Sequence, residues 1–280
     1  MTVKFNSFLV VKSQLSLFLL FFKQIIEMNF YNVEGKIITK PALDFGDIFN
    51  KSIELFKVVW LPGFVTVLFS ALLTLLLVLV MYTPLIALGI FNAEAFERQD
   101  PPIIYTLFSM VIMPIIMMCI FAANLLLMAG FYRICRAKDA KLNTDGHFYY
   151  FKKQYMIKAF ILASITIGLA IVGMLACGVG LIYLGVPLAL LPVFLAFEEE
   201  LSALEIVKAS FALGNKNWLV LFGVTFVMGL IAQLGVILCV VGVLFTVMLA
   251  RIPIYYAYKN GVGFADETED RLKALVPDFE

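Results

Sequence analysis

Apolar residues gather in long runs along this chain, and the lengths of the runs predict membrane-spanning helices. A helix rises 1.5 Å per residue, so a bilayer core of about 30 Å needs about 20 residues. The run from Ala159 to Phe197 carries no charge and would be roughly 58 Å long as one straight helix. We therefore predict two spans, 159–177 and 181–197, with a bend at the glycines of Cys177-Gly-Val-Gly180.

The same reasoning predicts two more hairpins. The run from Trp218 to Tyr258 gives spans at 218–238 and 243–258, with a bend at Cys239-Val-Val-Gly242. Upstream, a span at 61–82 ends before Pro84, and a span at 103–130 is kinked at Pro114. The prediction is an all-α integral membrane protein with six transmembrane helices arranged as three hairpins.

Amphipathic segments precede the hairpins. Residues 44–57 have apolar side chains at helical spacing, and residues 202–215 open with the capping-box pair Ser202 and Glu205. Each segment is expected to form an interfacial helix parallel to the membrane. A third segment, beginning at Asp145 and including His147-Phe-Tyr-Tyr-Phe-Lys-Lys153, matches this pattern less well.

Matching positions predict a pseudo-repeat of one interfacial helix and one hairpin. Ser52 precedes Trp60 by eight residues, as Ser210 precedes Trp218. A shift of about 62 residues superimposes Gly173, Cys177 and Gly180 on Gly235, Cys239 and Gly242, and a shift of about 61 superimposes Pro192, Ala196 and Phe197 on Pro253, Ala257 and Tyr258.

The distribution of Lys and Arg predicts the orientation. Between Met28 and the first span there are four, in the second connection seven, in the fourth connection two, and around the end of the last span and in the tail four. The opposite side has only Arg98. Because cytoplasmic segments hold the positive excess, both termini are predicted to be cytoplasmic.

Composition supports membrane location. Hydrophobic residues make up 62% of the 280 residues and charged residues 15%, with a mean hydropathy of +0.99. This composition excludes a water-soluble globule. The net charge of +1 provides no general attraction for nucleic acid. The four cysteines form no CxxC pair, and Cys177 and Cys239 would approach one another only if the hairpins pack symmetrically.

The ends of the chain differ from its centre. Residues 1–27 hold an apolar run too short to cross a bilayer, and we expect this extension to be a start-site artefact, with Met28 as the true start. Residues 28–260 form one membrane domain, and residues 261–280 form a cytoplasmic tail.

Several motifs resemble a known family, the bacterial membrane proteins grouped with the glycerophosphoryl diester phosphodiesterase membrane domain. They are Phe45-Gly-Asp-Ile-Phe-Asn-Lys-Ser-Ile-Glu-Leu-Phe56, Gly180-Leu-Ile-Tyr183, Phe197-Glu-Glu-Glu200, Ala203-Leu204, Ser210, Gly214-Asn215 and Trp218. The resemblance covers about Ala42 to Asn260 and implies a six-span protein of the bacterial inner membrane. It does not extend to the phosphodiesterase activity, because the soluble enzyme domain is absent from this sequence.

Polar residues inside apolar segments are the candidate site residues. Asn124, Gln233 and Arg251 fall within predicted spans. Arg251 either extends to the headgroups or pairs with Glu198, Glu199 or Glu200, which could otherwise be a solvated helix N-terminus. A single histidine, His147, cannot form a multi-histidine metal site, so no cofactor or metal is expected.

Three classes of function are compatible with these features. We favour a non-enzymatic scaffold or lipid-interacting component, in which the basic and aromatic connection from Arg133 to Lys158 holds anionic lipid headgroups. A transporter or channel would need a water path lined by Asn124, Gln233 and Arg251. An intramembrane enzyme would need Glu198 to Glu200, His147 and Arg251 to converge.

Overall fold

The computed structural model describes residues 29–87, 103–142, 146–175, 178–235 and 240–264, and these ranges contain helices and turns but no strand. The elements are α2 (Phe45–Ala87), α4 (Ile103–Ala140), α5 (Lys153–Leu175), α6 (Val179–Ala189), α7 (Leu191–Phe197), α8 (Ala203–Lys216), α9 (Trp218–Gln233), α10 (Val240–Thr246), the 3-10 helix η2 (Val247–Ala250) and α11 (Ile252–Gly261). Residues 29–39 are also helical.

Four of the helical segments are long and apolar enough to cross a membrane, or five if the bent pair α8 and α9 forms one span. This confirms an all-helical chain with several apolar helices suited to a bilayer. The extension 1–27 and most of the tail 261–280 lie outside the described residues.

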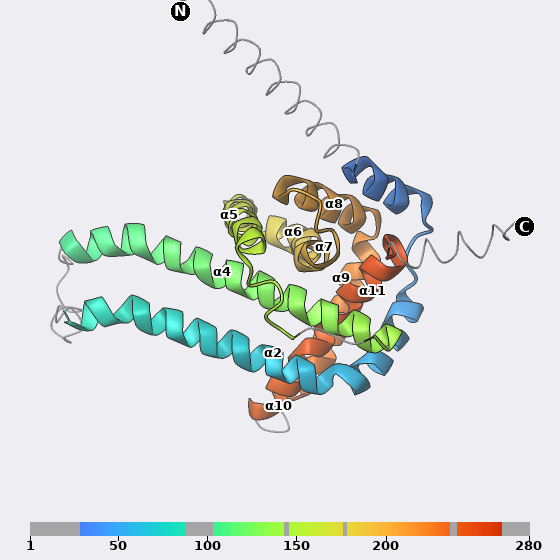
Figure 1. The fold of residues 1–280 in the computed structure, drawn as a ribbon, viewed down its shortest axis with the longest axis horizontal. Helices are drawn as coiled ribbons and strands as arrows, with labels where there is room; N and C mark the ends of the chain where they lie inside the picture. Colours follow the sequence, from blue (N-terminus) through green and yellow to red (C-terminus); the bar gives the residue numbers. More distant parts are fainter. Residues whose placement is uncertain (1–28, 88–102, 143–145, 176–177, 236–239, 265–280) are drawn as a thin grey trace, which may run out of the picture.

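The longest helices, α2 and α4, lie side by side and extend beyond the rest of the molecule (Figure 1). The prediction of a separate interfacial helix at 44–57 is wrong, because α2 continues through this segment and the following apolar run as one helix of 43 residues. The helix continues through Pro62 and Gly63, the pair of helix-breaking residues at this boundary, so they do not end it.

The amphipathic segment before α9 does form a separate helix. α8 meets α9 at a bend of 88°. The predicted capping box is present, since the Ser202 hydroxyl accepts from the Glu205 backbone N–H and the Glu205 carboxylate accepts from the Ser202 N–H at 2.8 Å. The corresponding segment before α5 forms turns at residues 147–150, so the expected third helix is not present.

Two reversals bring pairs of glycines together. A Cβ atom added to Gly180 on α6 would lie 2.8 Å from the Cα of Gly173 on α5. A Cβ atom added to Gly235 after α9 would lie 2.9 Å from the carbonyl carbon of Gly242 on α10. Before the first returning arm, Gly178 adopts a left-handed conformation with φ 76°, as expected at the predicted bend.

The second arm of each of these two hairpins, α6–α7 and α10–α11, is interrupted two residues before a proline. α6 gives way to α7 at Leu190, and Pro192 lies in the first turn of α7. After η2, α11 begins beyond Arg251, and Pro253 lies in its first turn. Because proline lacks a backbone donor, it fits a first turn better than a helix interior.

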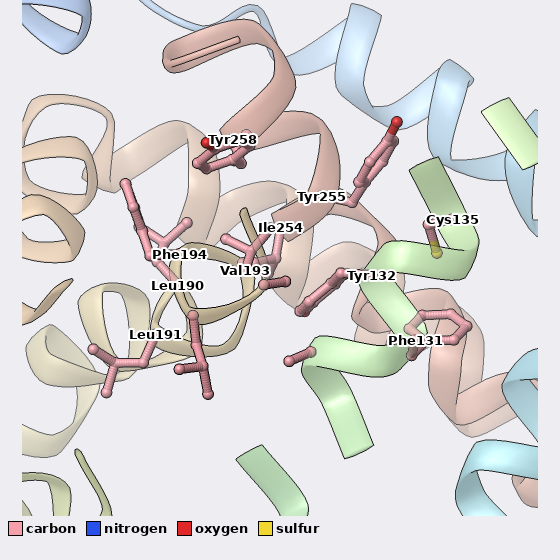
Figure 2. Close-up of a cluster of buried hydrophobic side chains, with 14 of the residues drawn as sticks. Phe131, Tyr132, Cys135, Leu190, Leu191, Val193, Phe194, Ile254, Tyr255 and Tyr258 are labelled. Atoms are coloured by element: carbon pink, nitrogen blue, oxygen red, sulfur yellow. The ribbon is translucent and has the colours of Figure 1, made fainter. Parts of the chain in front are cut away.

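The core lies where α4, α7 and α11 meet. Figure 2 shows Tyr132 of α4 pointing toward Val193 of α7 and Ile254 of α11, and the same buried cluster includes Phe131, Phe194, Tyr255 and Tyr258. In Figure 1, α5, α6 and α7 are seen nearly end-on, whereas α2 and α4 lie across the view. The α5–α6 hairpin therefore crosses the α2–α4 pair steeply and does not extend it into a parallel bundle.

Candidate functional site

Polar and aromatic side chains concentrate around α11, beside the end of α4. Asp139 accepts hydrogen bonds from the hydroxyls of Tyr255 at 2.7 Å and Tyr256 at 3.4 Å. It also forms an ion pair with Lys259, with 2.6 Å between Nζ and Oδ2. Three donors within about one helical turn of α11 thus meet one carboxylate, which fixes the end of α4 against α11.

A second carboxylate is held on the other side of α11. The Tyr258 hydroxyl donates to Glu198 Oε1 at 2.6 Å. Partial burial raises the pKa of Glu198, while the hydrogen bond from Tyr258 and the nearby charge of Lys36 act in the opposite direction. Phe194 and Tyr258 pack edge to face at 5.3 Å between ring centroids, so the carboxylate lies beside an apolar layer.

The basic connection from Arg133 to Lys158 begins in the last turns of α4 and ends in α5, and some of its cationic side chains contact other residues of the protein. The Arg133 guanidinium lies 3.6 Å from the ring centroid of Tyr149, and the Lys152 ammonium lies 4.3 Å from the same centroid. The Tyr150 hydroxyl donates to the Ala196 carbonyl at 2.6 Å, and burial raises the pKa of this tyrosine to about 12. Cation–π contacts of this kind stabilise a folded loop and also leave positive charge at its surface.

A cleft of about 760 Å³ opens between the segment 36–44, the first turns of α2 and the end of α11. Its charged lining residues are Lys36, Lys40, Lys51, Lys259, Asp44 and Asp47. Asp47 accepts from Lys51 and, at 3.1 Å, from the amide of Asn260, which links α2 to α11. The excess of lysine makes this end of the molecule cationic.

The predicted charged residues are not brought together. Among the described residues, Arg251 forms no ion pair with any of the three glutamates, and its exposed side chain lies between η2 and α11. Glu198 bonds Tyr258, Glu200 accepts from Asn29 at 2.8 Å, and the Glu199 carbonyl accepts from Lys158.

The predicted intramembrane polar residues are also separate. Asn124 accepts a hydrogen bond from Ser70 of α2 and donates to the Ile120 carbonyl at 2.9 Å, so it links α2 to α4. Gln233 is exposed at the end of α9. No contact between described residues joins Asn124, Gln233 and Arg251, and none of the three lines the lysine cleft.

His147 and the cysteines have structural surroundings where they are described. His147 Nε2 lies 3.2 Å from the Pro62 carbonyl, which fits a donating tautomer. Cys135 is buried and Cys119 is half-buried, whereas Cys177 and Cys239 fall outside the described residues. Within the described part of the chain, no group of three His, Cys, Asp or Glu residues could hold a metal ion.

Sequence reasoning missed Asp139 and its partners Tyr255, Tyr256 and Lys259. The partners are more than 110 residues away along the chain, so no local residue spacing predicts the contact. The available signal was the isolated acid in a strongly basic connection, together with two adjacent tyrosines at the end of the last apolar segment.

Comparisons of the chain with protein-family models, with curated proteins and with solved structures find no match.

Proposed function

We propose that this protein is a non-enzymatic, lipid-organising component of the bacterial inner membrane, with both termini cytoplasmic. One observation carries the proposal: α2 and α4 are divided along their length into an exposed apolar part and a charged, hydrogen-bonded part. The most apolar 18-residue windows of the two helices are only 11% and 17% buried. Exposed apolar surface of this extent needs lipid, while the opposite end carries the lysine cleft and the basic connection.

Anionic lipid headgroups are the proposed partner of the basic connection from Arg133 to Lys158. Arg133, Arg136 and Lys152 contact aromatic rings, which leaves the exposed Lys138, Lys141 and Lys153 facing outward. A basic residue near a membrane surface contributes about 1 kcal/mol of attraction to anionic lipid.

The pseudo-repeat is part of the same proposal. The close glycine pairs and the interruptions at Leu190 and Arg251 recur at the positions related by the sequence shift. The lengths of the apolar runs and the Lys and Arg distribution support six crossings. The contacts of the two later hairpins favour fewer crossings.

The other classes of function have less support. Transport was predicted to use Asn124, Gln233 and Arg251, and these residues make separate contacts. An intramembrane enzyme would need His147 beside Glu198 and Arg251, yet His147 bonds the Pro62 carbonyl and Glu198 bonds Tyr258.

The test is lipid retention by the purified protein, measured by native mass spectrometry with phosphatidylglycerol and phosphatidylcholine. Lys138→Gln combined with Lys153→Gln is expected to lower the affinity for phosphatidylglycerol by about 2 kcal/mol, or roughly 30-fold. Lys57→Gln combined with Lys208→Gln removes the same number of charges outside both the basic connection and the lysine cleft and serves as the control. Equal retention of both lipids by the wild-type protein would reject the proposal.

A further inference from the structure

Residues near the tips of the two later hairpins contact Trp218, the first residue of α9, and Trp60, which lies within α2. Trp218 Nε1 donates to the Tyr183 carbonyl at 3.0 Å, and the Tyr183 hydroxyl donates to Asn215 at 2.6 Å. Phe245 stacks on Phe64 with 4.2 Å between ring centroids and lies 6.1 Å from the ring of Trp60. Tyr183 and Phe245 are themselves related by the 62-residue shift.

These contacts conflict with six crossings. In the six-span arrangement, Tyr183 lies near the outer end of its span and Trp218 at the inner end of another, about 25 Å apart along the membrane normal. Phe245 and Trp60 would be separated in the same way. The observed contacts instead place each hairpin tip at the level of a tryptophan that belongs to the cytoplasmic boundary.

The lengths of α9 and of the helices that follow it agree with incomplete crossing by this hairpin. α9 has 16 residues, fewer than the about 20 that a bilayer requires. Its return is divided among α10, η2 and α11, of 7, 4 and 10 residues. α5 is uninterrupted and has 23 residues, so for the α5–α6 hairpin the contact of Tyr183 with Trp218, and not helix length, opposes a crossing. The α2–α4 pair extends beyond the other described helices (Figure 1).

We infer that the α5–α6 and α9–α10 hairpins lie in the cytoplasmic leaflet without crossing the membrane, with their tips at the level of Trp218 and Trp60, so that only the α2–α4 hairpin crosses. The inference deepens the proposed function and rests on it, because it names the partner of the later hairpins: the acyl chains of the cytoplasmic leaflet.

Exposed apolar stripes provide the surface for these acyl chains. On α9 the stripe is Leu219, Phe222, Phe226, Leu230 and Leu234; on α5 and at its tip it is Ile157, Ile161, Ile171, Val172 and Leu175. The opposite face of α9 is buried through Leu221, Val224 and Met228. A helix with one face on the protein and the other in lipid suits insertion into one leaflet.

Distances between spin labels in a lipid bilayer test the inference. In a cysteine-free background, Ile182→Cys with Leu219→Cys places labels next to Tyr183 and Trp218, and Leu61→Cys with Leu244→Cys places them next to Trp60 and Phe245. All four sites flank the observed contacts. We expect both distances to be below about 20 Å, whereas six crossings require about 25 Å or more.

A spin-label distance of about 25 Å or more for either pair overturns the inference for that hairpin. Labelling of Ala93→Cys by a membrane-impermeant maleimide in intact cells tests the proposed function separately. Its external labelling is expected in both topologies. If Ala93→Cys is not labelled, the orientation in the proposed function is wrong. If Ala93→Cys is labelled and the spin labels are far apart, only the inference about the α5–α6 and α9–α10 hairpins is wrong.

Discussion

Tyr258 donates a 2.6 Å hydrogen bond to Glu198, and this pair joins the end of α7 to α11 beside the cationic cleft. Lys36 and Glu200 are the other charged groups that influence the carboxyl. Glu198 is the acid among the predicted site residues whose pKa is raised, so it gives the contact a defined dependence on pH.

The first prediction concerns this dependence. Because burial raises the folded-state pKa of Glu198, the folded protein binds this proton more readily than the unfolded chain. The stabilisation that proton binding by Glu198 provides is fully present below the ordinary glutamate pKa of about 4.3. It is lost as the pH rises through the raised pKa of Glu198 in the folded protein. Glu198→Gln is expected to flatten this part of the pH profile of the melting temperature in detergent. An unchanged slope would contradict the assignment.

The second prediction compares the two tyrosines that share Asp139. Tyr255→Phe removes a 2.7 Å hydrogen bond to a charged acceptor and is expected to lower the free energy of unfolding by about 1.5–3 kcal/mol. Tyr256→Phe removes a 3.4 Å contact and should cost less. Thermal denaturation of both variants under one set of conditions gives the comparison. A larger loss of stability for Tyr256→Phe would mean that Tyr256, and not Tyr255, makes the stronger hydrogen bond to Asp139.

The third prediction concerns the glycine pair in the α5–α6 hairpin. The added methyl group of Gly180→Ala would meet the backbone of Gly173, and we expect a loss of about 1–3 kcal/mol. Gly168→Ala on α5 is the matched control. Its added Cβ meets nothing within 4 Å, and alanine favours a helix, so stability should be unchanged or higher by up to about 1 kcal/mol. Similar melting temperatures for the two variants would reject close packing at the reversal.

The fourth prediction uses two serines of the α8 region. Ser202→Ala removes the N-cap of the capping box and is expected to cost about 1 kcal/mol. Ser210 is fully buried, and its hydroxyl has no hydrogen-bond partner among the described residues. Ser210→Ala should therefore leave stability unchanged or increase it. Chemical denaturation in detergent distinguishes the two, and an equal loss would mean that Ser210 has a polar partner.

Local patterns were sufficient to predict some elements but not their arrangement. The capping box of Ser202 and Glu205 and the reversal at Gly178 depend on neighbouring residues, so the sequence alone identified them. The continuity of α2 was missed because an amphipathic pattern followed by an apolar run does not require a break between them.

The site was less predictable than the helices, because its contacts link distant segments. Asp139 depends on α11, and the separation of Arg251 from Glu198 depends on how η2 and α11 pack against α4 and α7. The contacts of Tyr183 with Trp218 are also tertiary, and run lengths and charge distribution carry no information about them.

The uninterrupted course of α2 has a mechanical consequence. The helix is roughly 65 Å long, and a side chain added at Gly63 would press against Met248 and Phe131. This close packing fixes α2 against η2 and α4 about 27 Å from its first residue, so the apolar remainder of the helix extends from a firmly held base.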